Sequence, residues 1–99
     1  MHVREVPRIQ GGVSITALDA IRQAAQQLHT VNIQYTDAKG ASSQREVEPY
    51  SLRPGKDPGS LRFFAFDPAK SSIRGFRMDR VSVAEVTPNT YVPRWVVEL

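Results

Sequence analysis

Arginine is the residue type in this sequence best suited to bind an anionic partner. Ten of the thirteen basic residues are arginine, and the formal net charge is +3. A guanidinium group binds phosphate or carboxylate with two parallel hydrogen bonds and stacks on flat rings. The candidate ligand-binding arginines are Arg45, Arg53, Arg62, Arg74, Arg77 and Arg80. Because neighbouring strands lie about 4.8 Å apart, arginines on different strands can converge on one phosphate-binding site.

Aromatic side chains in the same part of the chain could complete such a site. Tyr35, Tyr50 and Phe64 are the candidates for stacking on a base or shaping the pocket. Stacking on an aromatic side chain contributes about 1–3 kcal/mol per base in proteins that bind single strands. The competing interpretation is packing in the core, which is the more common role for Phe63 and Trp95.

Some of the arginines could instead form ion pairs inside the protein. Strict alternation places Arg74 and Arg80 on the face of Phe76, whereas Arg77 points away from it. A buried arginine without a partner is costly. Arg74 and Arg80 are therefore expected either to lie at the rim of the fold or to pair with an acidic side chain. Arg45 could likewise form an internal ion pair. The acids available are Asp79, Glu46 and Glu48.

The sequence offers little support for catalysis. His2 and His29 are isolated, with no metal-ligand spacing, and His29 is expected to end a helix. Glu46 and Glu48 share a strand face, as a general acid/base pair could, but that polar row is expected to be hydrated. Ser51 has no nucleophile elbow, and the chain has no cysteine and no glycine-rich phosphate loop. We therefore predict a protein that is not an enzyme and that needs no metal or cofactor.

One helix and about five short strands must position these residues. An apolar stripe at helical spacing, from Leu18 to Leu28, predicts a helix over about residues 16–29. Beyond it, apolar and polar residues alternate as in strands, and turn residues such as those of Pro54–Gly59 separate the runs. The predicted strands cover about residues 30–36, 43–53, 60–67, 72–80 and 81–87.

These elements predict a mainly β fold, either a small barrel or a strongly curved sheet with the helix packed across one end. A chain of this length forms one core, and we expect residues 14–99 to be a single domain. Residues 1–13 are expected to be a tail or an added edge strand. A change of face between Met78 and Val81 predicts a kink or bulge near Arg80.

The order of these segments resembles that of the WYL domain family. An opening helix is followed by Val31–Tyr35, Arg45–Leu52, an aromatic strand and Arg74–Val81, and the likeness covers about residues 17–96. The family's fold is an Sm-like or SH3-like barrel, which agrees with the five strands and one N-terminal helix. The namesake Trp-Tyr-Leu is replaced by Arg62-Phe63-Phe64, which removes one aromatic contact and adds a positive charge.

The resemblance implies a regulatory role. Family members usually follow a winged helix-turn-helix in bacterial transcription regulators, or lie beside nucleases and helicases, and are regarded as ligand sensors. Some bind single-stranded nucleic acid. This chain has no room for a DNA-reading helical module, so a separate DNA-binding or nuclease partner, or a longer parent protein, would supply the output. We predict a ligand-binding domain for single-stranded nucleic acid or a nucleotide-like anion.

The alternative hypothesis is a protein–protein assembly module. The C-terminal segment Pro88–Leu99 is too apolar for a free tail and is expected to pack on the barrel or on a second copy. A homo-oligomer through this segment or through a strand edge stays open, with the arginines serving solubility.

No stretch approaches the roughly 18 apolar residues of a spanning helix, and Met1–Gln10 lacks the apolar run of a secretion signal. We therefore expect a cytoplasmic protein without a membrane partner.

Overall fold

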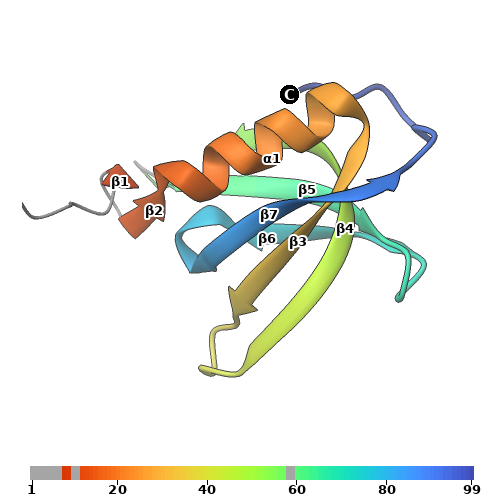
Figure 1. The fold of residues 1–99 in the computed structure, drawn as a ribbon. Helices are drawn as coiled ribbons and strands as arrows, with labels where there is room; N and C mark the ends of the chain where they lie inside the picture. Colours follow the sequence, from red (N-terminus) through yellow and green to blue (C-terminus); the bar gives the residue numbers. More distant parts are fainter. Residues whose placement is uncertain (1–7, 10–11, 58–59) are drawn as a thin grey trace, which may run out of the picture.

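One helix and a curved β-sheet make up the fold of this computed structural model (Figure 1), which describes residues 8–9, 12–57 and 60–99. The elements in chain order are β1 (Arg8–Ile9), β2 (Val13–Ser14), α1 (Ile15–Gln27), β3 (His29–Thr36), β4 (Ser42–Pro54), β5 (Leu61–Asp67), β6 (Ser72–Arg77), the 3-10 helix η2 (Met78–Arg80) and β7 (Val81–Thr90). The predicted mainly β fold with one N-terminal helix is confirmed.

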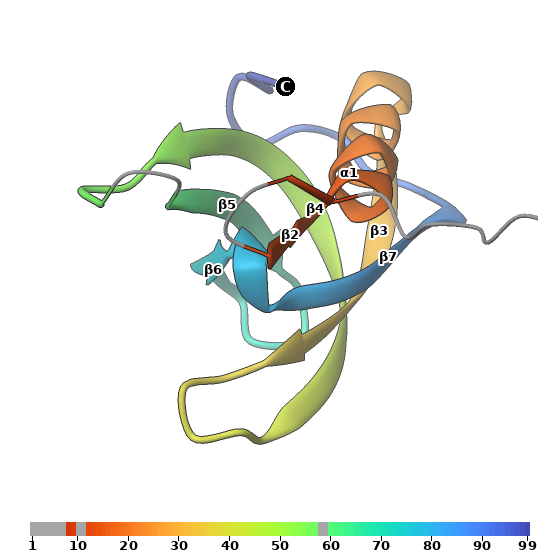
Figure 2. The same cartoon turned by 90° about the vertical axis from the view of Figure 1, so that its left-hand side faces the viewer.

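Five strands form a single antiparallel sheet in the order β6-β5-β4-β3-β7. Strand β4 is long and strongly bent (Figure 2), so its first half pairs with β3 and its second half pairs with β5. The sheet curls until Tyr35 of β3 reaches β6, where its hydroxyl accepts a hydrogen bond from the Arg77 N–H at 3.3 Å. The Tyr35 ring also packs edge-on against Phe76, with centroids 5.0 Å apart.

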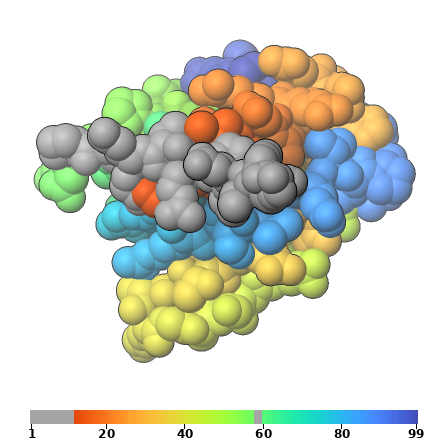
Figure 3. All heavy atoms as spheres, turned by 60° about the vertical axis from the view of Figure 1, so that its left-hand side comes forward, coloured from red at the N-terminus to blue at the C-terminus, as the bar shows by residue number. Residues whose placement is uncertain are grey.

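Helix α1 packs its apolar stripe on β3, β4 and β7. Ser14 caps its N-terminus by accepting a hydrogen bond from the Ala17 N–H at 3.2 Å. In the space-filling view, the helix lies beside the C-terminal segment at one end of the molecule, and the β3–β4 hairpin projects from the other end (Figure 3). The core beneath the helix includes the fully buried side chains of Ile21, Ile33, Phe63, Phe76 and Met78.

Several local predictions need correction. Helix α1 ends at Gln27 because Leu28 adopts a left-handed conformation with φ of 58°. His29, predicted to end the helix, instead begins β3, and its Nδ1 lies 2.6 Å from the Thr87 carbonyl oxygen. The interruption expected near Arg80 is the 3-10 helix η2, so the strand predicted over 72–80 ends at Arg77.

Strand β7 also runs further than the predicted 81–87, to Thr90. It continues through Pro88 because β7 is an edge strand and its register with β3 shifts between Val86 and Thr90. The predicted N-terminal tail or edge strand, residues 1–13, lies largely outside the described residues. Within it, β1 and β2 pair with each other as a two-stranded sheet.

The apolar C-terminal segment packs on the protein's own sheet, one of the two arrangements expected for it. Tyr91 is buried, and its hydroxyl donates a hydrogen bond to the Pro49 carbonyl oxygen at 2.6 Å. The Glu98 N–H donates to the Tyr50 carbonyl oxygen at 2.7 Å, and Glu98 forms a parallel bridge with Ser51. The segment therefore crosses β4. Within the described residues, no helix is long and apolar enough to cross a membrane.

Candidate functional site

Three of the six candidate arginines stand side by side on the outer face of the sheet. Arg53 of β4 lies directly opposite Arg62 of β5, and Arg62 lies directly opposite Arg77 of β6. Residues paired in this way share a face, with Cα atoms about 4.5–5.5 Å apart. Their neighbours Phe63 and Phe76 are buried, so the arginines point away from the core. Arg53, Arg62 and Arg77 are termed the arginine row below.

A hollow of about 700 Å³ borders the arginine row. All three arginines line it, together with Phe64, Lys56 and Asp57. Lys56 adds a fourth cation, and Asp57 is the only acidic side chain among the described residues that line the hollow. The hollow is therefore electropositive and open to solvent, which suits an anionic ligand.

Among the described residues, the contacts that hold the side chains of the arginine row are exposed ones. Arg53 Nη2 lies 2.6 Å from Glu98 Oε1, and both side chains are at least half exposed. Arg77 makes two hydrogen bonds to Asp79, of 3.0 and 2.7 Å, and these hold the pKa of the Asp79 carboxyl below its usual range. Arg62 is exposed and has no ion-pair partner in the described part of the chain. Exposed pairs contribute about 0–1 kcal/mol, so a phosphate could replace these carboxylates.

Phe64 lies beside the arginine row on the same outer face. It is paired with Ser51 of β4 and Gly75 of β6. A Cβ atom at Gly75 would come within 2.9 Å of the Phe64 ring, so the ring occupies the space that a side chain on β6 would fill. The half-buried ring is thus spread across the sheet, with part of its surface open to the hollow.

The other three arginines lie elsewhere. Arg45 forms an internal ion pair, as the sequence left open, but its partner is the buried Asp67 at 3.0 Å and none of the three acids named there. Arg74 lies opposite Ala65, on the inner face of the sheet. Arg80 lines a different hollow, of about 540 Å³, beside the β3–β4 turn. The structure therefore brings together three of the six arginines, and the remaining three are distributed around the molecule.

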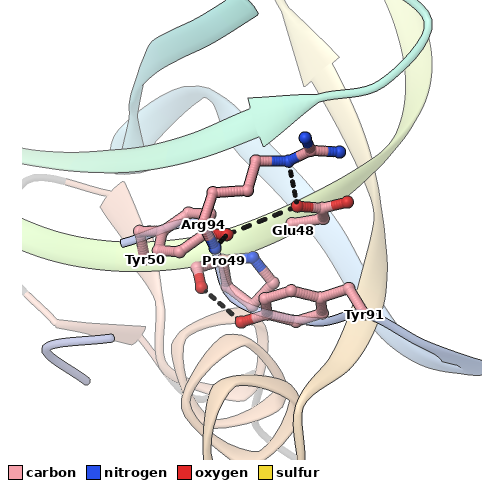
Figure 4. Close-up of polar contacts among 5 residues, drawn as sticks. All are labelled: Glu48, Pro49, Tyr50, Tyr91 and Arg94. Carbon is pink, nitrogen blue, oxygen red and sulfur yellow. Dashed lines mark hydrogen bonds and ion pairs between the residues drawn. The ribbon is translucent and has the colours of Figure 1, made fainter. Parts of the chain in front are cut away.

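The two candidate tyrosines make contacts inside the protein. Tyr35 joins β3 to β6 through the contacts described above. Tyr50 is buried, its hydroxyl donates to Glu48 Oε1 at 3.4 Å, and it accepts a hydrogen bond from the Arg94 N–H at 2.8 Å (Figure 4). Burial raises the pKa of the Tyr50 hydroxyl. Of the three candidate aromatics, Phe64 is the one that lines the hollow beside the arginine row.

Glu48 and Arg94 form a cluster that the sequence did not predict. Glu48 was expected in a hydrated row, but only 9% of its side chain is exposed, because the C-terminal segment covers it. Arg94 Nε lies 3.2 Å from Glu48 Oε1 (Figure 4), and its guanidinium carbon lies 4.1 Å from the centre of the Phe66 ring. The indication of this cluster in the sequence was the apolar C-terminal segment Pro88–Leu99, which was expected to pack on the barrel or on a second copy.

The histidine and acidic side chains of the described residues bear on metal binding and on acid/base chemistry. No group of three or more histidine, cysteine or acidic side chains there could hold a metal ion. Glu46, weighed above as half of an acid/base pair, accepts hydrogen bonds from Thr30 and Asn89, and the bond from Thr30 is the main cause of its lowered pKa. A carboxylate stabilised in its charged form is a poor proton donor at neutral pH.

Comparisons with known proteins agree with this fold. A family model described as "WYL domain" matches residues 16–86. Among solved structures, proteasome accessory factor B/C (PafBC) of Arthrobacter aurescens is similar, with 26% sequence identity and a TM-score of 0.66. The match covers 81% of this chain and 13% of that chain. Among curated proteins, no sequence matches significantly.

Proposed function

The chain belongs to the WYL domain family, and we propose on this basis that it binds single-stranded nucleic acid or a nucleotide-like anion without catalysing a reaction. Family membership supports a regulatory, ligand-sensing role in general. The arginine row is the proposed phosphate-binding surface. The regulatory output would come from a DNA-binding or nuclease partner, or from other parts of a longer protein.

The observation that supports this proposal most directly is the alignment of Arg53, Arg62 and Arg77 across three neighbouring strands. Like charges directly opposite each other on neighbouring strands destabilise a sheet. The ion pairs of Arg53 with Glu98 and of Arg77 with Asp79 offset part of this repulsion in the unbound protein. Bound phosphate groups would relieve the remaining repulsion and accept hydrogen bonds from Arg62, which has no ion-pair partner among the described residues.

A nucleotide-like ligand is favoured over a simple anion by the aromatic side chain next to the charges. Phe64 lines the same hollow as the arginine row and leaves part of its ring accessible. A planar base bound to this ring would place its phosphate groups among the guanidinium groups. Proteins that bind single strands combine such a basic groove with stacking surfaces.

Titration of a fluorescently labelled single-stranded oligonucleotide at low salt tests the proposal, with binding followed by anisotropy. Arg62→Glu should weaken binding about tenfold or more, since a hydrogen bond to a charged group contributes about 1.5–3 kcal/mol. Arg22→Glu, an exposed site on α1, makes the same charge change away from the row and should have a much smaller effect. Equal losses in the two variants, or no binding by the parent protein, would overturn the proposal.

Exposed apolar side chains favour a second candidate function, assembly with another protein. Val92 and Val96 are 86% and 79% exposed, and Trp95 of the same segment is 51% exposed. Large apolar side chains that cluster on a surface often mark an interface. If the protein forms a dimer through this segment, light scattering should give twice the monomer mass, and a Val92→Ser/Val96→Ser variant should return it to the monomer.

A further inference from the structure

A second hollow, of about 360 Å³, adjoins the arginine row on the outer face of the sheet. Its walls include Ile73, Trp95 and Val96, which are among the exposed large apolar residues of the chain. Arg53 and Phe64 line both this hollow and the hollow of the arginine row. The two hollows therefore form one continuous surface, basic on one side and apolar on the other.

Trp95 is the largest side chain of the apolar hollow, and it is both accessible and well held. Its ring centre lies 5.3 Å from that of Tyr50, in an edge-on arrangement at 81°, and 6.1 Å from that of Phe66. Half of its surface stays exposed. A planar ligand could therefore stack on the indole at little further cost in side-chain entropy, because packing has already restricted the ring.

The backbone around Trp95 is fixed to β4 from both sides. Before it, the Arg94 N–H donates to the Tyr50 hydroxyl at 2.8 Å. After it, the Glu98 N–H donates to the Tyr50 carbonyl oxygen at 2.7 Å. Arg94 also binds Glu48 and lies over the Phe66 ring. The C-terminal segment thus places Trp95 in the hollow that Phe64 and Arg53 also line.

We propose that Trp95 is the base-stacking residue of the ligand site and that the ligand is a single strand of two or more nucleotides, an inference that rests on the proposed function. From Arg53, which lines the apolar hollow, the arginine row extends across two strand spacings, about 10 Å, to Arg77. A base on Trp95 places its own phosphate near Arg53, and the following phosphates can then contact Arg62 and Arg77. A free mononucleotide would leave part of this row unused.

The test uses the intrinsic fluorescence of the full chain, because Trp95 is its only tryptophan. A single-stranded oligothymidylate is compared with an abasic oligonucleotide of the same length, which keeps the phosphates and lacks the bases. The oligothymidylate should quench and shift the Trp95 emission, and the abasic strand should leave it nearly unchanged. This measurement needs no variant and therefore no assumption about variant folding.

Variants extend the test to affinity. Trp95→Ala should bind the oligothymidylate between about fivefold and 100-fold more weakly, as expected for the loss of one stacked base. Its affinity for the abasic strand should equal that of the parent protein. Trp95→Phe should recover much of the lost affinity, because a phenyl ring also stacks.

The outcomes separate this inference from the proposed function. If binding depends on Arg62 but Trp95→Ala binds as the parent does, or both strands change the emission equally, the stacking role of Trp95 is wrong and the phosphate-binding proposal stands. If Trp95→Ala alters only the oligomeric mass, the residue belongs to an interface and the inference is also wrong. If neither strand binds, both proposals fail.

Discussion

At the scale of single residues, the arginine row differs from ordinary surface arginines in what holds it. Arg45 and Arg94 are paired with largely buried carboxylates, Asp67 and Glu48. Breaking such a pair leaves a poorly hydrated charge behind, so these two arginines are poorly placed to exchange partners. Arg53 and Arg77, in contrast, hold exposed carboxylates that a phosphate could replace at little cost.

Asp79 should report on the state of Arg77. The hydrogen bonds from Arg77 are the main cause of its lowered pKa, and Arg80 adds to the effect. Arg77→Ala should therefore raise the Asp79 pKa toward its ordinary value of 3.8. Carboxyl carbon shifts in an NMR pH titration would measure this change. Arg62→Ala, which removes a neighbour without a contact to Asp79, should leave the pKa as it is.

The contact between Arg77 and Asp79 also determines how the stability of the fold changes at low pH. Because the pKa of Asp79 is lower in the folded protein, the charged carboxylate stabilises the fold above about pH 3.8, and this contribution is lost as the pH falls through the folded-state pKa. Denaturant titrations below pH 4 should therefore show a smaller acid-induced loss in Arg77→Ala than in the parent protein. An equal loss in both proteins would contradict this assignment.

At the scale of elements, the contact between the C-terminal segment and β4 is the part that positions Trp95. The buried Tyr91 hydroxyl donates to the Pro49 carbonyl oxygen, within the bent part of β4 (Figure 4). Tyr91→Phe leaves that carbonyl without its donor and should lower the free energy of unfolding by about 1–3 kcal/mol. Urea denaturation at neutral pH would measure it, and unchanged stability would show that the bond contributes nothing.

Tyr91 also gives this contact a pH dependence. Burial raises its pKa well above the ordinary value of 10.0, so the folded protein favours the neutral hydroxyl. The stabilisation that the neutral Tyr91 hydroxyl contributes should therefore be fully present below about pH 10. It should fall as the pH rises further toward the folded-state pKa. Tyr91→Phe should remove this part of the alkaline loss in parallel denaturation curves, because its ring cannot ionise.

Strand β6 should influence the site through Gly75, because the absence of a side chain there leaves room for the Phe64 ring. Gly75→Ala would force the Phe64 ring to move, because the new Cβ would lie 2.9 Å from it. The half-buried ring can swing outward, and alanine gains about 0.5–1 kcal/mol over glycine within a strand. The free energy of unfolding should thus change little, while affinity for an oligothymidylate falls several-fold and affinity for an abasic strand is kept. An unchanged oligothymidylate affinity would show that Phe64 has no part in binding.

The elements were largely predictable because they depend on local patterns. Alternation around Ile33 and the aromatic run at Phe63 predicted strands, and the apolar stripe predicted the helix. The burial of Glu48 was not predictable, because it depends on a segment more than 40 residues away in sequence. The arginine row likewise needed the observed register, since a slip of one residue would turn Arg62 toward the core.

At the scale of the whole molecule, a net charge of +3 is too small to explain strong binding to nucleic acid by general attraction alone. The proposed site therefore depends on where the charges lie. The fold gathers three arginines on one face of the sheet.

The salt dependence of binding distinguishes a local site from a diffuse one. Each phosphate contact on a single strand contributes about 0.7 to the slope of log affinity against log salt concentration, so three contacts give a slope of about −2. Anisotropy titrations at several salt concentrations should find that value for the parent protein and a slope smaller by about 0.7 for Arg62→Ala. Arg22→Ala, with the same net charge but an intact arginine row, should keep the parent slope. If the two variants shift the slope equally, the attraction comes from the net charge of the molecule, and the arginine row is not the binding surface.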